Sequence, residues 1–148
     1  MSTRCIIGIA DSINDEKMRA VYCQHDGYPD SVGFELLRSY DTEEKINALL
    51  EGGAMSSLGS TVENTDYYND GETAYHAQIH RPKPDRFGFT TNIEYRYIYA
   101  RDERKWYVCD LNDRIIPVKD AIEEIERRRA GKMKERAERL GVSQEANT

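Results

Sequence analysis

The segment Tyr22 to Asp30 carries the densest group of chemically useful side chains in the sequence. It reads Tyr-Cys-Gln-His-Asp-Gly-Tyr-Pro-Asp, and it leaves an extended stretch through a glycine turn into a helix. Free backbone amides at a helix start attract anions, and amide, imidazole and phenol side chains form hydrogen bonds beside them. The pattern predicts a site for a small anionic ligand. Its predicted binding residues are Arg4, Gln24, His25, Gly27 and Tyr28.

A purely structural turn is the alternative for this segment. Asp26 and Asp30 can satisfy backbone donors, because Asp-Gly and Tyr-Pro are ordinary turn dipeptides. Both carboxylates also bring negative charge to the place where an anion would bind. The glycine is expected to allow a positive φ at position 27, and Pro29 is expected to end the strand.

A catalytic use of the same residues would involve Cys23, His25 and Asp26 in a small hydrolase or transferase. Cys23 and His25 share one face of a strand, but residues two apart on a strand lie ~6.5 Å apart at Cα, which is poor for direct contact. An inert, buried Cys23 is favoured instead. We therefore expect no catalytic residues, and a binding protein rather than an enzyme.

A metal site would use His76 and His80, with His25 or Cys23 as a further ligand. On a strand, the two histidines would lie ~13 Å apart, too far to share one ion. The sequence therefore predicts no metal site and no cofactor.

Composition limits the class of protein. The chain has 148 residues, three cysteines and a net charge of −6. This length fits one domain, and an odd cysteine number without a Cys-x-x-Cys pair argues against a disulfide framework or zinc ribbon. The longest apolar stretch, Cys5 to Ala10, is far short of the ~20 residues of a membrane span. We expect no membrane partner, no signal peptide and a cytoplasmic location, and the net negative charge makes nucleic acid an unfavourable partner.

Hydrophobic periodicity predicts an α+β fold. Alternating patterns between turn residues predict strands over 4–10, 18–25, 73–80, 93–100, 105–111 and 115–116. Helical spacing predicts helices over 30–40, capped by Asp30 or Ser31, over 41–51, capped by Asp41 or Thr42, and over 118–140. The expected architecture is an antiparallel sheet of about five strands, with two helices after the first hairpin and a long C-terminal helix. Residues 54–71 are expected to form an ordered loop near 55–58 and then a mobile stretch around 63–72.

Two packing predictions follow from the same patterns. Tyr95, Tyr97 and Tyr99 are expected to share one sheet face, with Ile98 on the opposite face. The sequence has ten tyrosines against three phenylalanines, and such an excess suits a binding surface or a half-buried sheet. The predicted core consists of Ile7, Ile9, Val21, Leu36, Leu37, Ile46, Leu49, Val108 and Ile122.

The C-terminal helix differs in charge from the rest of the chain. Residues 127–139 contain seven basic and two acidic side chains, a local charge of +5, so the other residues carry −11. We divide the chain into an α+β domain, 1–117, and a basic helix with a frayed tail, 118–148. The basic segment is either a solvated helix or a surface that docks on an acidic partner, including the acidic body of a second copy in a homo-oligomer.

Several motifs resemble a family of small uncharacterised proteins from phages, prophages and bacterial genomes. The shared features are Thr3-Arg4 opening the first strand, Tyr22-x-Gln24-x-Asp26-Gly27-Tyr28-Pro29, and Gly33-x-Glu35-Leu36. The resemblance continues through Ser56-Ser57-Leu58-Gly59 and Lys105-Trp106-Tyr107. It implies a phage origin, and no established activity comes with it. The basic C-terminal helix lies outside the pattern.

These observations lead to one functional hypothesis and two alternatives. We expect a phage-type binding protein that acts against host defence in the host-cell cytoplasm, by sequestering a small anionic, nucleotide-like signal or a host protein. The step from phage protein to sequestration is an analogy with other small phage proteins. The alternatives are the Cys23–His25–Asp26 hydrolase or transferase, and a structural module that assembles through its C-terminal helix.

Overall fold

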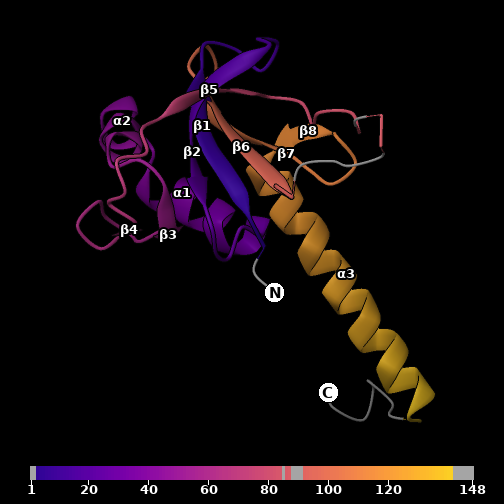
Figure 1. Cartoon of the computed structure of the whole chain (residues 1–148). Helices are drawn as coiled ribbons and strands as arrows, with labels where there is room; N and C mark the ends of the chain where they lie inside the picture. Colours follow the sequence, from indigo (N-terminus) through magenta and orange to yellow (C-terminus); the bar gives the residue numbers. More distant parts are fainter. Residues whose placement is uncertain (1–2, 85, 88–91, 142–148) are drawn as a thin grey trace.

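The computed structural model describes residues 3–84, 86–87 and 92–141, which form a mixed sheet with helices on one face (Figure 1). The strands are β1 (Cys5–Ala10), β2 (Lys17–Cys23), β3 (Met55–Ser57), β4 (Asp66–Tyr67), β5 (Tyr75–Gln78), β6 (Tyr95–Ala100), β7 (Lys105–Cys109) and β8 (Ile115–Pro117). The helical elements are a π-helical turn, η1 (Pro29–Gly33), and the α-helices α1 (Phe34–Ser39), α2 (Glu43–Glu51) and α3 (Val118–Arg139). The predicted α+β class is confirmed.

Over the described residues the sheet is mixed and has eight strands, so the prediction of an antiparallel sheet of about five strands is confirmed only in part. The order is β4-β3-β2-β1-β6-β7-β8, and β5 pairs with β2. The β1–β2 and β6–β7 hairpins are antiparallel as expected, but β6 lies parallel to β1, with Cys5 opposite Tyr95. Alternation along a strand fixes which face a side chain occupies, not the direction of its neighbour. The long connection from β2 to β6 gives the chain the length that a parallel crossover requires.

The extra strands lie in the segment that was expected to be a loop. Met55–Ser57 forms β3 beside the end of β2, and Asp66–Tyr67 forms β4 beside β3. Tyr67 holds this segment to α2, because its hydroxyl donates a hydrogen bond to the carbonyl of Leu49 at 2.6 Å. This hydrogen bond and the pairings of β3 with β2 and β4 order a stretch whose composition is typical of a loop.

The helices cover one face of the sheet, and the tyrosine alternation of β6 is confirmed there. Tyr97 and Tyr99 are buried under the helices with Tyr95 packed beside them, while Ile98 belongs to the cluster on the opposite face. The Tyr97 hydroxyl donates to the carbonyl of Gly27 at 2.6 Å, and Trp106 Nε1 donates to the carbonyl of Tyr40 at 2.8 Å. Each buried polar tip therefore has a partner, as burial of tyrosine and tryptophan requires.

Most of the predicted core is buried, with two exceptions. Ile122 is only partly buried, and Leu37 is wrong as a core residue because it is 37% exposed. Neighbours on a helix point about 100° apart, so Leu36 faces the sheet and Leu37 turns away from it. The helical segment also begins at Pro29, without a side-chain cap, rather than at Asp30 or Ser31. The predicted cap of α2 is confirmed, since Thr42 Oγ1 accepts a hydrogen bond from the Lys45 amide.

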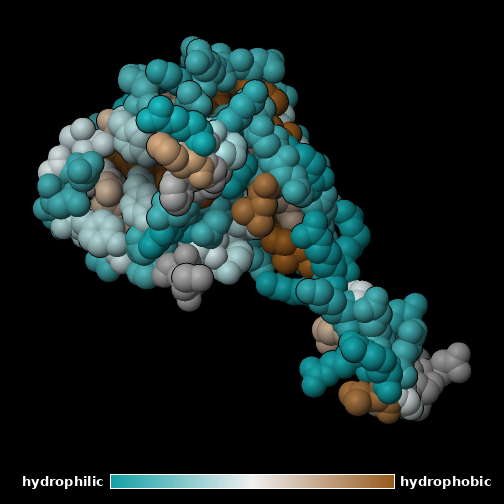
Figure 2. Space-filling view, turned by 45° about the vertical axis from the view of Figure 1, so that its right-hand side comes forward, coloured by the Kyte–Doolittle hydropathy of each residue, from teal (hydrophilic) through white to brown (hydrophobic). Residues whose placement is uncertain are grey.

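In the described part of α3, the buried side chains lie in its first turn, and Arg129 further along adds an ion pair with Asp30 of the body. Val118 and Ala121 are buried, and Arg114 ties this part of the helix to the β7–β8 turn through ion pairs with Glu124 at 3.0 Å and Asp110 at 2.8 Å. Residues 126–141 are almost entirely exposed and project from the body (Figure 1), and we call them the α3 arm. Its surface is hydrophilic over most of the side seen in Figure 2.

The opposite face of the sheet carries a second, smaller cluster of buried side chains. Ile6, Met18, Ala20 and Ile98 lie there, together with Ile79 from the chain that follows β5. None of the helices in the described ranges combines the length and the apolar character needed to cross a membrane.

Candidate functional site

Gly27, at the centre of the predicted ligand-binding turn, has a structural role. It is buried, its amide donates to the carbonyl of Thr3 at 2.9 Å, and its carbonyl accepts from Tyr97. A Cβ at this position would lie 2.8 Å from the Thr3 oxygen and 3.0 Å from the Cys5 Cβ. The expected positive φ at Gly27 is wrong, because Asp26 adopts it instead, at 60°. Glycine is needed here for close approach to the N-terminal strand.

The amides of the helix start make internal hydrogen bonds. Ser31 N donates to the Tyr28 carbonyl at 2.9 Å, and Val32 N donates to the Asp26 carbonyl at 3.2 Å. Pro29 has no N–H to offer. The Ser31 and Val32 amides at the helix start therefore close the turn itself.

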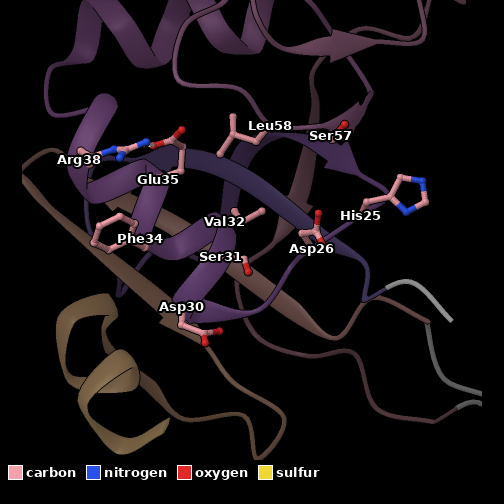
Figure 3. A pocket seen from close by; sticks show the side chains of 10 residues that line it. All are labelled: His25, Asp26, Asp30, Ser31, Val32, Phe34, Glu35, Arg38, Ser57 and Leu58. Atoms are coloured by element: carbon pink, nitrogen blue, oxygen red, sulfur yellow. Dashed lines mark hydrogen bonds and ion pairs between the residues drawn. The ribbon is translucent and has the colours of Figure 1, made fainter. Parts of the chain in front are cut away.

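A cavity of about 290 Å³ lies beside this turn, and we call it the turn cavity (Figure 3). Its charged and titratable lining residues are His25, Asp26, Asp30, Glu35 and Arg38. Arg38 forms an ion pair with Glu35 at 2.8 Å, and Asp30 forms one with Arg129 of the α3 arm at 2.7 Å. Three carboxylates against one lining guanidinium make the cavity unfavourable for an anion.

The Cys23 thiol lies in the core and not in the turn cavity. It is fully buried, and its Sγ contacts the carbonyl oxygen of His25 at 3.6 Å. Cys23 is also opposite Cys5 in the β1–β2 hairpin. The hydrogen bond from Cys5 lowers the pKa of Cys23 against the effect of burial, whereas burial raises the pKa of Cys5. A thiol in this position has no open path to a substrate, which weakens the hydrolase alternative.

A larger cavity, of about 640 Å³, is lined in part by Tyr22 near the end of β2 and by Gln24 just after it, and we call it the tyrosine cavity. Its lining residues are Tyr22, Gln24, Ala54, Tyr68, Asp70, Glu72 and Tyr75. Tyr68 and Tyr75 are each 45% exposed, so their rings are available to a ligand. The Tyr22 hydroxyl donates a hydrogen bond to Gln24 Oε1, which fixes the orientation of that amide.

Two arginines bring positive charge to the sheet face on which Tyr22 lies. Arg4 precedes β1, and Arg96 lies on β6 opposite Ile6, which is itself opposite Tyr22. Arg96 is only 5% exposed, and its Nη1 donates to the carbonyl of Gln78 at 2.7 Å. The Nε atoms of both arginines are buried and have no hydrogen-bond partner among the described residues. A buried guanidinium that lacks part of its hydrogen bonding is costly to the fold.

The tyrosine pKa values place these charges close to the rings. Burial raises the pKa of Tyr75, and the Arg96 charge opposes that effect. Burial likewise raises the pKa of Tyr22, and the Arg4 charge opposes it. The two arginine charges therefore favour negative charge at these tyrosines, whereas the Glu72 charge disfavours it at Tyr75.

The structure separates the five residues that the sequence placed in one site. Gln24 lines the tyrosine cavity and Arg4 lies beside it, whereas His25 lines the turn cavity. Gly27 is buried, and Tyr28 is 47% exposed, with its ring centre 6.4 Å from that of Tyr95. The sequence analysis missed Tyr22, Tyr68, Tyr75 and Arg96. The tyrosine excess was the one sequence signal that could have pointed to three of them.

No family model, curated protein or solved structure matches the chain.

Proposed function

We propose that the protein is a non-catalytic binding protein that captures a small anionic ligand of the nucleotide class in the tyrosine cavity. The observation that carries this proposal is the presence of two under-bonded arginines, Arg4 and Arg96, on the sheet face that holds three cavity-lining tyrosines. Aromatic walls with nearby guanidinium groups are suited to a ligand that has both a flat base and a phosphate.

The lining residues suggest how such a ligand would be held. The exposed rings of Tyr68 and Tyr75 can stack on a base, and the oriented Gln24 amide can form hydrogen bonds with its edge. Asp70 and Glu72 line the cavity and Arg4 and Arg96 do not, so the phosphate would lie at the edge of the cavity toward Arg4, while the two carboxylates accept hydrogen bonds from sugar hydroxyls. These groups bind and orient a ligand, and none of the lining residues is a cysteine or a histidine that would act on it.

The biological role in this proposal comes from the resemblance to small phage proteins. Capture without conversion would lower the free concentration of a host signal and so act in phage–host conflict. A host protein remains the other ligand that such a surface can take. A native mass spectrum of the protein purified from phage-infected cells distinguishes the two, since a retained small molecule and a retained protein differ in mass.

The first test compares tyrosines inside and outside the cavity. Tyr75→Ala and Tyr68→Ala are each expected to weaken binding of adenosine monophosphate, adenosine triphosphate or a cyclic dinucleotide by about tenfold, because each removes a stacking ring. Tyr28→Ala is the matched control, since Tyr28 is equally exposed but does not line the cavity. Isothermal titration calorimetry measures each dissociation constant.

In the same experiment, Arg4→Gln distinguishes the contribution of the phosphate to binding from that of the base. It is expected to weaken binding of adenosine monophosphate while leaving the weaker binding of adenosine unchanged, because adenosine has no charge for the guanidinium to pair with. The proposal is overturned if none of the probes binds at about 1 mM and no small molecule is retained in the native mass spectrum.

The α3 arm supports a second candidate function, assembly with another copy of the chain. The arm is exposed, and its charge of +5 over residues 127–139 is complementary to the −11 of the remaining residues. A helix that is polar all round gains little from its own hydrogen bonds in water, so a partner surface would stabilise it. The acidic body of a second copy is the partner that this charge division favours.

Truncation after Gly131 tests the assembly candidate. Removing the outer arm is expected to convert an oligomer into a monomer, while the free energy of unfolding changes by less than about 0.5 kcal/mol, because these residues pack on little else. Sedimentation velocity at low and high salt measures the first effect, and salt should weaken the full-length oligomer. A full-length chain that is monomeric at low salt would rule out this candidate.

A further inference from the structure

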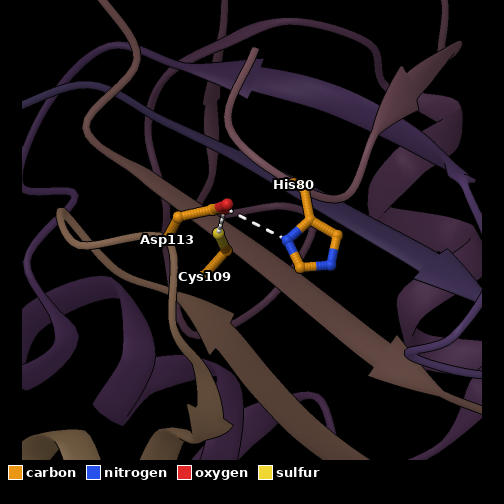
Figure 4. Close-up of side chains that lie close together, drawn as sticks. All are labelled: His80, Cys109 and Asp113. Carbon is orange, nitrogen blue, oxygen red and sulfur yellow. Dashed lines mark hydrogen bonds and ion pairs between the residues drawn. The ribbon is translucent and has the colours of Figure 1, made fainter. Parts of the chain in front are cut away.

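Three potential metal ligands from two distant parts of the chain meet at the face of the sheet opposite the helices (Figure 4). Asp113 Oδ1 lies 3.1 Å from His80 Nδ1 and 3.1 Å from Cys109 Sγ. All three ligand atoms lie within 4.8 Å of one another. Ligands of a tetrahedral zinc ion with bond lengths of about 2.0–2.3 Å lie at comparable separations, so one ion can reach all three with small side-chain adjustments.

The chain holds these ligands in place before any ion binds. Cys109 ends β7, and the following turn is fixed by Asp110, whose Oδ1 accepts from the Asn112 and Arg114 amides at 2.9 and 3.0 Å. Asp113 has a positive φ of 59°, which turns its carboxylate back toward Cys109. The Arg81 amide donates to the same Asp113 oxygen at 2.9 Å and so fixes the position of His80 beside it.

We propose that His80, Cys109 and Asp113 form a zinc-binding site, with the fourth position taken by water or by an exogenous ligand. Thiolate, imidazole and carboxylate are the donor groups that Zn²⁺ accepts in proteins, and a site with three protein ligands leaves one position open. Ionised Cys109 and Asp113 balance the charge of Zn²⁺, so the buried Arg96 opposite Cys109 faces a neutral centre and not a net positive one.

In the metal-free protein, the Cys109 thiol donates a hydrogen bond to Asp113 Oδ1 at 3.1 Å. Burial, together with the hydrogen bond and the negative charge of Asp113, raises the pKa of Cys109 to about 12, so the thiol donates to the carboxylate. Bound zinc would replace this hydrogen bond with a bond to the Cys109 sulfur.

The ion would join two parts of the structure that are connected otherwise by weaker contacts. His80 belongs to the chain that leaves β5 and covers the second cluster, while Cys109 and Asp113 belong to the β7–β8 turn. Zinc would therefore link the chain that follows β5 to the β7–β8 turn. The sequence paired His80 with His76, whereas the structure brings it beside Cys109 and Asp113, so ligand spacing along the chain gave no signal.

Titration of the full-length, reduced protein with Co²⁺ and Zn²⁺ tests the site. Co²⁺ is expected to produce a near-ultraviolet thiolate-to-cobalt charge-transfer band, and Zn²⁺ is expected to remove that band and raise the Tm. Cys109→Ser should abolish the band, and His80→Ala and Asp113→Asn should each weaken Zn²⁺ binding by about tenfold or more. The Tm of each metal-free variant shows that the protein is folded.

His76→Ala is the control, because His76 lies on β5 opposite Arg19 and outside the cluster. It should leave the cobalt band and the zinc affinity unchanged. The absence of a charge-transfer band in the wild-type protein overturns the proposal, and so does zinc affinity that falls equally in His76→Ala and His80→Ala. A band that persists in Cys109→Ser would assign the thiolate to Cys5 or Cys23 and would also overturn it.

Discussion

Leu36→Ala is expected to lower the free energy of unfolding by about 2–5 kcal/mol, whereas Leu37→Ala, one residue later, is expected to change it by less than about 1 kcal/mol. Leu36 is fully buried in the core cluster beneath the helices, and its truncation leaves a cavity there. Leu37 is 37% exposed, so a smaller side chain loses little contact with the protein. Both substitutions remove the same atoms from the same helix, and the two leucines differ only in burial.

Urea denaturation followed by the fluorescence of Trp106 measures both changes. Trp106 is the single tryptophan and is buried against Tyr99, with ring centres 5.4 Å apart, so its emission reports the loss of the same core. Equal destabilisation by the two substitutions would mean that α1 is rotated relative to the arrangement described here. A negligible effect of both would mean that α1 does not pack on the sheet.

The contrast between Leu36 and Leu37 illustrates what the sequence could predict about the fold. Period-two alternation correctly placed Tyr97 and Ile98 on opposite faces, because the side chains of a strand alternate regardless of its neighbours. Two adjacent leucines in a short helix give no such signal, since the π-helical turn before α1 shifts the face that meets the sheet. The sequence pattern also did not predict the parallel pairing of β1 with β6, because this pairing depends on the path of the long connection from β2 to β6.

The structure distributes the residues of the predicted binding turn over different surroundings, because neighbours in sequence need not line the same cavity. Gln24 and His25 follow β2 directly, and the structure places Gln24 in the tyrosine cavity and His25 in the turn cavity. The other walls of the tyrosine cavity come from Tyr68 and Tyr75, far along the chain. Such a cavity depends on strand order, which local patterns do not determine.

Gly27→Val is expected to destabilise the protein by about 3 kcal/mol or more, although Gly27 lies in the segment that reads most like a binding motif. The new side chain would force apart the turn and the N-terminal strand, because its Cβ would lie 2.8 Å from the Thr3 carbonyl oxygen, and overpacking of this kind costs about 1–3 kcal/mol. Displacing the Gly27 carbonyl would also leave the buried Tyr97 hydroxyl without its acceptor, which costs about 1–3 kcal/mol more.

Tyr28→Ala and Tyr97→Phe complete this test of the turn. Tyr28 is exposed, so its truncation should leave the Tm nearly unchanged, and Tyr97→Phe should lose only the hydrogen bond to Gly27. Thermal unfolding followed by circular dichroism gives the Tm of the three variants. Nucleotide titration of each folded variant gives its binding affinity. If Gly27→Val keeps the wild-type Tm but loses nucleotide binding, the turn itself contacts the ligand. A lowered Tm with unchanged binding per folded molecule instead assigns the Asp-Gly-Tyr-Pro turn to the fold, because it joins the first strand to Tyr97 beneath the helices.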